Sequence, residues 1–350
     1  MPVAVHSSTP RMPAVSPRHL QQVVLPVVDT SQVSEARRSV AERTTALRFS
    51  ARTAGEAAIV ATEMAGNLVK HAGGGELLLR TIGELPNAGI ELLALDRGPG
   101  MDVARCLVDG YSTAASPGTG LGAIQRLSAS SDFYAVVGGG TAVLSTIWSH
   151  AAPARSSAPA VGGVNVPLPG QEICGDAWVV RCDESSIEVV VVDGLGHGPE
   201  AAKAAAAACA AFLERGGRSS AEVLDAADAA LRATRGAAMG AAIIDLRRGE
   251  VTFSGIGNTV AVVLTGDTVQ HLVSFGGIVG QRMVRGRSFT ASWSDQSIFI
   301  AHSDGIGTRW NLGAYPGLAV RHPSVIAGVL YRDFGRGRDD ASVVVVKSRS

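Results

Sequence analysis

Three side chains suited to phosphoryl chemistry lie four residues apart in the segment EMAGNLVKHAGGG, which runs from Glu63 to Gly75. Glu63, Asn67 and His71 would share one face of a helix, because residues i, i+4 and i+8 are neighbours on its surface. The Glu63 carboxylate can take a proton from an attacking hydroxyl or water. The Asn67 amide oxygen is a hard ligand of the kind that Mg²⁺ accepts. His71 is assigned no chemistry, because the helix dipole alone favours a histidine near a helix C-terminus.

Two later segments could bind the rest of a nucleotide. In LDRGPGMD, Asp96 ends an apolar stretch, and its carboxylate can accept a hydrogen bond from an exocyclic amine. Gly98 and Gly100 flank a proline just beyond it and let the backbone approach a flat ligand closely. The segment GTGLGAIQRLS leads into a helix, and the amides at a helix N-terminus can bind phosphate. The glycines expected to contact the phosphates are Gly118, Gly120 and Gly122.

Four acidic segments in the second half predict a different site. They read CGDAW, VVVVDGLGHG, FIAHSDGIG and GRDDASVVVV, and three of them place an aspartate at one end of an apolar strand. Carboxylates gathered at one edge of a sheet repel one another unless a cation neutralises them. Hard oxygen ligands suit Mg²⁺ or Mn²⁺, and a pair of such ions can activate water for in-line phosphoryl displacement. The aspartates concerned are Asp176, Asp193, Asp304, Asp339 and Asp340.

Hydrophobic periodicity and turn residues indicate the elements that must position these side chains. In the first half, we expect a strand at 22–28, helices at 33–50 and 55–72, strands at 76–82 and 90–96, a short helix at 121–128 and a hairpin at 133–148. In the second half, we expect helices at 199–216, 220–235 and 324–331. Strands are expected there at 178–182, 187–193, 241–245, 251–257, 260–264, 298–302 and 342–347. Strands and helices that occur in blocks favour an α+β fold, with sheets packed between helix pairs.

Composition limits the possible classes of function. Lys and Arg number 31 and Asp and Glu 31 in the 350 residues, so the net charge is zero and no nucleic-acid surface is indicated. No apolar run reaches the ~18 residues of a membrane helix. Residues 1–20 lack the apolar region of a secretory signal and are expected to be a flexible leader. Residues 149–163, rich in Ala, Pro and Ser, are expected to link domains at 21–148 and 164–350. The four cysteines show no CxxC spacing, which favours free thiols and the cytoplasm.

The motifs of the first half resemble those of a known family. EMAGNLVKHA, LDRGPGMD and GTGLGAIQRLS resemble the N, G1 and G2 boxes of the GHKL ATPases, and are most similar to RsbT-type serine kinases of bacterial stress signalling. The resemblance extends over residues 36–148 and implies a Bergerat-type α/β sandwich that binds ATP and Mg²⁺. It implies that Glu63 is the catalytic base, that Asn67 binds Mg²⁺ and that Asp96 binds the adenine amine. The implied pocket and phosphate glycines are Gly98, Gly100, Gly118, Gly120 and Gly122.

The motifs of the second half resemble another family. DGLGHG before an alanine-rich helix, GIGN after a strand, and RDDAS resemble the SpoIIE-type branch of the metal-dependent type 2C protein phosphatases, which includes RsbX. The resemblance covers residues 164–347 and implies an α-β-β-α sandwich with two Mg²⁺ or Mn²⁺ ions. Asp176 and Asp193, with the Gly194 carbonyl, would bind the first ion. Asp193, Asp304 and Asp339 would bind the second.

Four other polar residues of the second half have weaker assignments. Asp340 lies where the wider family often has Asn, so it is expected behind the metal ligands. His197 lies in the glycine turn and is expected to position that loop. Arg181 is a candidate for binding the substrate phosphate, and Glu172 is a candidate for orienting a metal-bound water.

Together, the two resemblances imply a bifunctional regulator of bacterial partner switching. The first domain would phosphorylate a Ser or Thr of a protein partner, and the second would hydrolyse phosphoserine or phosphothreonine. The implied partner is a STAS-domain anti-sigma-factor antagonist or a stressosome protein. Two alternatives stay open for the first domain: an ATP-dependent anti-sigma factor that binds a sigma factor, or an ATP sensor that regulates the phosphatase.

Overall fold

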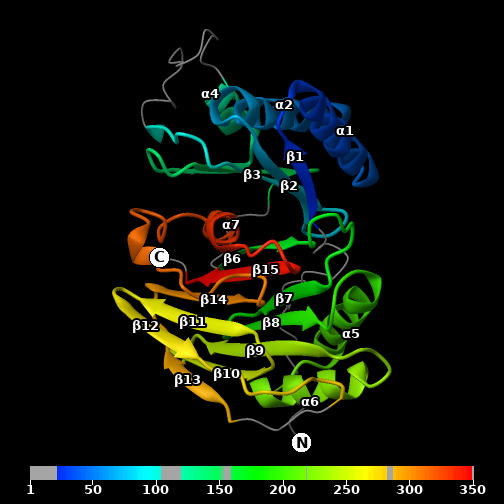
Figure 1. Cartoon of the computed structure of the whole chain (residues 1–350), viewed down its shortest axis with the longest axis vertical. Helices are drawn as coiled ribbons and strands as arrows, with labels where there is room; N and C mark the ends of the chain where they lie inside the picture. The colour runs from blue at the N-terminus through cyan, green and yellow to red at the C-terminus, as the bar shows by residue number, and fades with distance from the viewer. Residues whose placement is uncertain are drawn as a thin grey trace, which may run out of the picture.

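The structure is a computed structural model that describes residues 22–103, 120–150, 152, 159–217, 219–281 and 287–348. Three five-stranded antiparallel sheets stack in layers, with helices on the outer faces and one helix between two of the sheets (Figure 1). The first half of the chain forms one sheet with its helices, and the second half forms the other two. The leader expected at 1–20 and the predicted phosphate ligand Gly118 lie outside the described residues.

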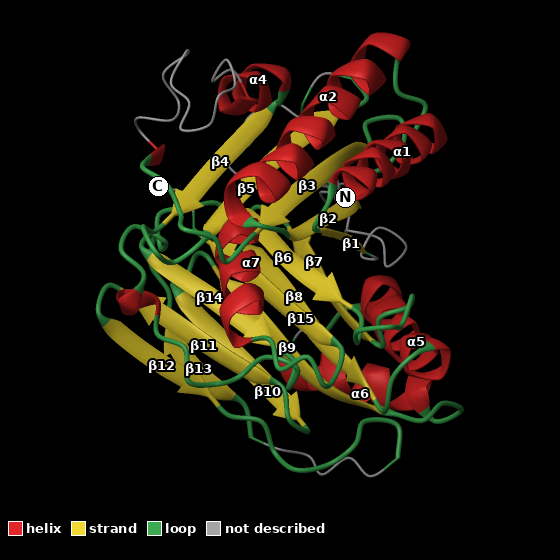
Figure 2. Ribbon diagram, turned by 45° about the horizontal axis from the view of Figure 1, so that its top comes forward, coloured by secondary structure: helices red, strands yellow, loops and turns green. Residues whose placement is uncertain are grey.

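The first sheet has the strand order β1-β2-β3-β5-β4 and is covered by helices on one face. Side chains alternate between the two faces of a strand. Leu77 and Leu79 therefore pack under the helices, whereas Leu78 belongs to the core on the opposite face. The strands are β1 (Val23–Val27), β2 (Gly75–Ile82), β3 (Gly89–Leu95), β4 (Ser130–Ala135) and β5 (Thr141–Trp148), and the helices are α1 (Thr30–Ala46), α2 (Ala51–Asn67) and α4 (Gly120–Leu127) (Figure 2).

The end of α2 departs from the helix expected to residue 72. Asp29 and Ser50 cap the starts of α1 and α2 through their side-chain oxygens. After Asn67, however, the chain continues as one π-helical turn, η2 (Leu68–Ala72). A π-helical turn has i→i+5 hydrogen bonds, so the regular i, i+4 row of the α-helix stops at Asn67. His71 therefore does not continue that row, and it is exposed.

The second half of the chain forms two sheets packed face to face. The second sheet has the order β12-β11-β14-β15-β6, and the third has the order β13-β10-β9-β8-β7. Val344 and Val346 point into the core between these sheets, whereas Val343 and Val345 point to the other side of the second sheet. The strands are β6 (Ala160–Val166), β7 (Asp176–Cys182), β8 (Ser186–Gly194), β9 (Ala237–Asp245), β10 (Glu250–Ile256), β11 (Val260–Thr265), β12 (Thr268–Leu272), β13 (Phe289–Ser292), β14 (Ser297–His302) and β15 (Ala341–Lys347).

Helices cover the outer faces of this pair of sheets. α5 (Pro199–Arg215) and α6 (Ser220–Leu231) pack on the third sheet. α7 (Pro323–Phe334), which follows the short 3₁₀ turn η3 (Leu312–Ala314), packs on the second sheet. The layers follow the expected α-β-β-α order, but among the described residues the second sheet is covered by a single helix, because the first sheet lies beyond it (Figure 1).

Three details differ from the expected organisation. β6 begins at Ala160, inside the segment expected to be a linker. Gly162 lies in this strand because α7 passes so close that a Cβ would lie 2.3 Å from the amide nitrogen of Ser324. Strands β12 and β13 were not predicted, and α6 ends at Leu231 rather than at residue 235.

None of the helices in the described ranges combines the length and the apolar composition needed to cross a membrane. The cysteines in those ranges, Cys174, Cys182 and Cys209, are free thiols.

Candidate functional site

The end of α2 and the start of α4 form the first candidate site. Glu63 and Asn67 are half-buried on successive turns of α2. α4 meets them at Gly120, where a Cβ would lie 2.7 Å from Glu63 Oε2 and 3.8 Å from Asn67 Oδ1. The structure thus brings the predicted base, the predicted Mg²⁺ ligand and one predicted phosphate-binding glycine together. Gly120 and Gly122 lie within α4 rather than ahead of it, and Gly122 is buried.

The loop after β3 carries the predicted adenine ligand. Asp96 Oδ1 accepts hydrogen bonds from the amides of Gly98 (2.8 Å) and Thr141 (3.1 Å). Burial raises the pKa of Asp96, and these hydrogen bonds oppose the shift. Gly98 packs against η2, where a Cβ would lie 2.7 Å from the Cα of Ala72, and Gly100 follows with a φ of 67°. The carboxylate is therefore held by backbone groups, and Thr141 is a contributor that no sequence motif indicated.

Ends of strands in the two packed sheets form the second candidate site. Asp176 on β7 is paired in register with Asp193 on β8. Asp176 is 4% exposed, and its Oδ2 has no hydrogen-bond partner within the described part of the chain. Burial and the charge of Asp193 hold the pKa of Asp176 well above its usual range. Burial, with the charges of Asp304 and Asp339, raises the pKa of Asp193 to about 7.

The other predicted ligands lie at the end of β8, after β14 and before β15. Burial and the charge of Asp339 raise the pKa of Asp304. Asn258 Nδ2 donates a hydrogen bond of 2.5 Å to Asp304 Oδ2. Asn258 was not predicted as a site residue, although the motif GIGN contains it. Gly194 is buried beside Asp193, and its amide donates to the carbonyl of Gly175 (3.2 Å).

Asp340 connects the start of β15 to the loop before β7. Its Oδ1 accepts a hydrogen bond from the amide of Leu168 (2.7 Å), and its Oδ2 accepts one from the amide of Gly175 (2.8 Å). Both carboxylate oxygens are therefore engaged within the protein. This side chain is suited to fixing the loop that carries Asp176.

The acidic residues fit divalent cations by donor type and charge. Among the described residues, no three His, Cys, Asp or Glu side chains are gathered closely enough to form a ready-made metal cluster. The buried, unpartnered Oδ2 of Asp176 and the raised pKa of Asp193 nevertheless mark carboxyl groups whose ionised forms the surrounding described residues do not stabilise. Hard carboxylate oxygens of this kind suit Mg²⁺ or Mn²⁺.

The weaker candidates are placed less favourably. Arg181 is buried, forms an ion pair with Glu188 on the neighbouring strand and lies 4.9 Å from the ring centroid of Phe212. Its charge is already compensated, so the structure does not support a role in phosphate binding. Glu172 and His197 are exposed.

Comparison with known proteins bears on the second half most directly. Residues 183–349 match the family model of stage II sporulation protein E, SpoIIE. Phosphoserine phosphatase RsbX of Bacillus subtilis (strain 168) is 25% identical over 139 residues, which cover 39% of this chain and 69% of RsbX. One solved chain comes from a study of the bacterial stressosome as a modular system adapted to control secondary messenger signalling. It is 28% identical, with a TM-score of 0.51 over 54% of this chain and 100% of that chain.

A second curated relative is a kinase. Serine/threonine-protein kinase RsbT of Bacillus subtilis (strain 168) is 31% identical over 88 residues, which cover 25% of this chain and 66% of RsbT. This chain thus spans about two thirds of the length of RsbT and of RsbX. The family match and the similarity to RsbX support a SpoIIE-type PP2C phosphatase domain in the C-terminal half of the chain.

Proposed function

We propose that this chain is a bifunctional regulator of a bacterial partner-switching system. Its second half would hydrolyse phosphoserine or phosphothreonine with two Mg²⁺ or Mn²⁺ ions. Its first half would phosphorylate a serine or threonine with ATP and Mg²⁺. The observation that carries the proposal is the set of aspartates from separate strand ends whose pKa values are raised by burial and by one another's charge.

In the phosphatase half, the aspartates would divide between two cations. Asp176 and Asp193, with the Gly194 carbonyl, would hold one cation, and Asp193, Asp304 and Asp339 would hold the other. Bound cations at these positions would supply positive charge to the phosphoryl oxygens and lower the pKa of a water. The protein itself would keep the carboxylates oriented.

Two polar contacts of the structure would support those ligands. Asn258 donates to Asp304 and so fixes the rotation of that carboxylate. Asp340 holds the loop before Asp176 through two backbone amides. Partners behind metal ligands affect metal affinity by orienting the ligands and setting their basicity.

In the kinase half, Glu63 would accept the proton of the substrate hydroxyl, Asn67 would hold Mg²⁺, and Asp96 would accept a hydrogen bond from the adenine amine. The close approach of Gly120 to Glu63 and Asn67 supports this assignment, because it places a helix N-terminus beside both side chains. The similarity to RsbT, a serine/threonine kinase, supports phosphate transfer to a protein rather than phosphate removal in this half. The glycines proposed to shape the pocket and contact the phosphates are Gly98, Gly100, Gly118, Gly120 and Gly122.

The protein partner that we propose is a STAS-domain anti-sigma-factor antagonist or a stressosome protein. The similarities of one chain to both RsbT and RsbX, and to a chain from a stressosome study, support this class of partner. Opposed activities would then set a phosphorylation level in the cytoplasm, where ATP is available. A sigma factor is the alternative partner for the first half.

Two variants separate the activities. Asp193→Ala should abolish metal-dependent phosphate release from a phosphoserine peptide and spare ATP binding. Glu63→Ala should abolish phosphorylation of the partner and spare ATP binding. Asp267→Ala, at an exposed turn between β11 and β12, is the matched control and should change neither activity. Hydrolysis retained by Asp193→Ala would contradict the phosphatase site.

A second candidate for the first half is an ATP sensor that controls the phosphatase. The observation that favours it is that α7 of the second half packs directly on β3 and β5 of the first sheet. Under this candidate, ATP would change phosphatase activity to the same extent in Glu63→Ala and in the wild-type chain. Phosphate transfer to a partner that Glu63→Ala abolishes would exclude sensing as the sole role.

A further inference from the structure

Helix α7 belongs to a buried cluster that both halves of the chain share. Figure 1 shows it between the first and second sheets. Leu93 and Leu95 of β3 share one buried cluster with Val329 of α7 and Val343 of β15. The approach is close at Gly328, where a Cβ would lie 2.7 Å from Leu93 Cδ2. A displacement of α7 would therefore shift side chains of both sheets, because packed interiors transmit strain.

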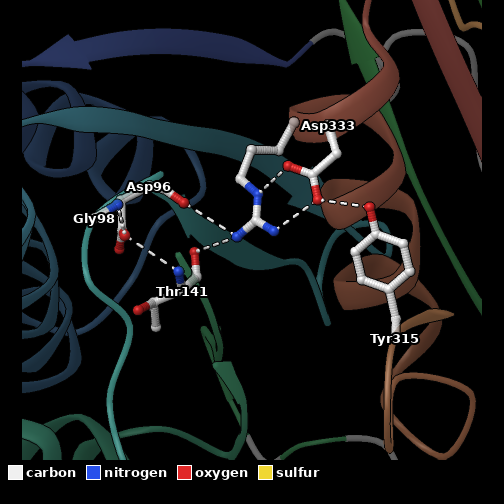
Figure 3. Close-up of polar contacts among 6 residues, drawn as sticks. Asp96, Gly98, Thr141, Tyr315 and Asp333 are labelled. Carbon is white, nitrogen blue, oxygen red and sulfur yellow. Dashed lines mark hydrogen bonds and ion pairs between the residues drawn. The ribbon is translucent and has the colours of Figure 1, made fainter. Parts of the chain in front are cut away.

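Near its C-terminal end, α7 reaches the proposed adenine ligand. The guanidinium of Arg332, which is 4% exposed, donates from Nη1 to the carbonyl oxygens of Asp96 (3.1 Å) and Thr141 (3.4 Å). Its Nε and Nη2 donate to the two oxygens of Asp333, both at 2.8 Å. The hydroxyl of Tyr315 donates to Asp333 as well (3.0 Å), and Figure 3 shows this chain of contacts. The loop that holds Asp96 is thus supported by a residue from the other half of the chain.

The residues that follow Arg332 reach the acidic site. The carbonyl of Phe334 accepts a hydrogen bond from the amide of Gly307 (2.8 Å), and the amide of Arg336 donates to the carbonyl of Gly305 (2.8 Å). Ile306 also forms an isolated antiparallel β-bridge with Gly335, the residue after α7. The end of α7 is therefore bonded to the loop 303–307, and the chain then continues through 335–340.

We propose that Arg332 is a positioning residue of the nucleotide pocket and that it couples nucleotide binding to the phosphatase loops 303–307 and 335–340, which carry Asp304 and Asp339. This inference rests on the proposed nucleotide site. A nucleotide that fixes the Asp96 loop would also fix Arg332, and through α7 it would fix the two acidic loops. By linkage, occupancy of the acidic site would change nucleotide affinity by the same factor.

Charge and burial explain why an arginine suits this position. Burial raises the pKa of Asp96, and the nearby positive charge of Arg332 works against that shift. Arg332 thereby favours the ionised carboxylate, which is the better acceptor for an amine. A lysine keeps the charge but lacks the planar fork that bonds to Asp333 and to the Asp96 loop together. The expected loss of nucleotide affinity in Arg332→Lys is about tenfold, the equivalent of one hydrogen bond to a charged group.

The first test measures binding of a fluorescent, non-hydrolysable ATP analogue to the full chain at fixed Mg²⁺. Arg332→Lys should weaken binding about tenfold, and Tyr315→Phe, which only frees Asp333, should weaken it about threefold. Arg321→Lys is the matched control, because Arg321 also bridges the halves, through Asp132 (3.3 Å), but does not contact the Asp96 loop. It should bind as the wild type does, and thermal unfolding would verify that all variants are folded.

The second test measures hydrogen exchange of 303–307 and 335–340 with and without the same analogue. The analogue should slow exchange there in the wild type and in Arg321→Lys, but not in Arg332→Lys at saturating analogue. Equal affinities of Arg332→Lys and wild type would overturn the positioning role. Binding without any change of exchange would overturn the coupling. If the wild type fails to bind the analogue, the nucleotide site itself is wrong, and this inference fails with it.

Discussion

Asp193→Asn should stabilise the metal-free protein while abolishing its phosphatase activity. The pKa of Asp193 is raised from 3.8 to about 7 by burial and by the charges of Asp304 and Asp339. One pKa unit corresponds to about 1.4 kcal/mol, so the ionised Asp193 lowers the free energy of unfolding at pH 8 by about 4 kcal/mol. The new amide would leave a polar group poorly paired, at a cost of about 1–3 kcal/mol. The net gain in unfolding free energy should be about 1–3 kcal/mol.

The stability difference between Asp193→Asn and the wild type should increase with pH. Below pH 3.8, Asp193 is protonated in both states and imposes no penalty. Between pH 3.8 and about 7, the folded protein binds more protons than the unfolded chain, so wild-type stability falls as pH rises. The asparagine does not titrate. Its advantage should therefore grow by about 2–3 kcal/mol between pH 5 and pH 8.

Urea unfolding in EDTA at pH 5 and pH 8 measures this difference. The matched control is Asp183→Asn, in the turn between β7 and β8. Burial would raise the pKa of Asp183, but hydrogen bonds from Ser185 and Ser186 outweigh it and lower the pKa, so its substitution should bring no gain at pH 8. Mn²⁺ at 100 times its Kd should then stabilise the wild type by about 2.7 kcal/mol and Asp193→Asn far less. An Asp193→Asn protein that is less stable than the wild type at pH 8 in EDTA would refute the proposed charge repulsion.

Three further substitutions test separate contacts. Gly120→Ala should stabilise α4 by up to about 1 kcal/mol, because alanine is the better helix former, and thermal unfolding measures this gain. The same substitution should lower the phosphorylation rate at least tenfold, because the new Cβ crowds the Glu63 carboxylate. Quenched-flow assays measure that rate. Asn258→Ala should weaken Mn²⁺ binding about 10–100-fold, because it removes the hydrogen bond to Asp304. Titration calorimetry measures this loss, and an unchanged Mn²⁺ affinity would contradict the role of the contact. Gly328→Leu should lower the unfolding free energy by about 1–3 kcal/mol, because the larger side chain overpacks the contact between α7 and the first sheet. Urea unfolding measures this loss, and an unchanged urea midpoint would show that α7 and the first sheet are not in close contact there.

Sequence patterns predicted the elements that carry the acidic residues well. The run of β-branched residues before Asp193 indicated β8, and the turn glycines after it indicated where that strand ends. The segment before Asp304 indicated β14 in the same manner. What the sequence could not provide is register. Only the pairing of β7 with β8 places Asp176 opposite Asp193, and only the packing of the two sheets brings Asp304 near them.

The misplaced predictions have physical causes. Gly162 is typical of a linker, but it lies in β6 because α7 leaves no room for a side chain. His71 has the spacing of an α-helical row, yet a π-helical turn ends that row at Asn67. Arg181 could not be recognised as a buried ion-paired residue until its partner Glu188 was placed on the neighbouring strand.

The sequence indicates part of the environment of α7, namely that the helix is buried. Residues from Pro323 to Leu330 are apolar or small around the whole helix, which is the pattern of a helix buried on all sides. No pattern indicated that the partner on one side is the first sheet, or that Arg332 bonds to the loop of Asp96. The bond between Arg332 and the carbonyl of Asp96 joins residues 236 positions apart. Contacts of this kind depend on tertiary packing alone.

The most direct test of the account is a mass-spectrometric phosphate count on STAS-domain proteins from the same genome. Each would be incubated with this chain and Mn²⁺, with and without ATP, starting from both phosphorylated and unphosphorylated forms. The account predicts that one serine or threonine gains phosphate with ATP and loses it without ATP. It predicts that Glu63→Ala abolishes only the gain and Asp193→Ala only the loss. No change of phosphate on any of these proteins, in either direction, would contradict the bifunctional assignment.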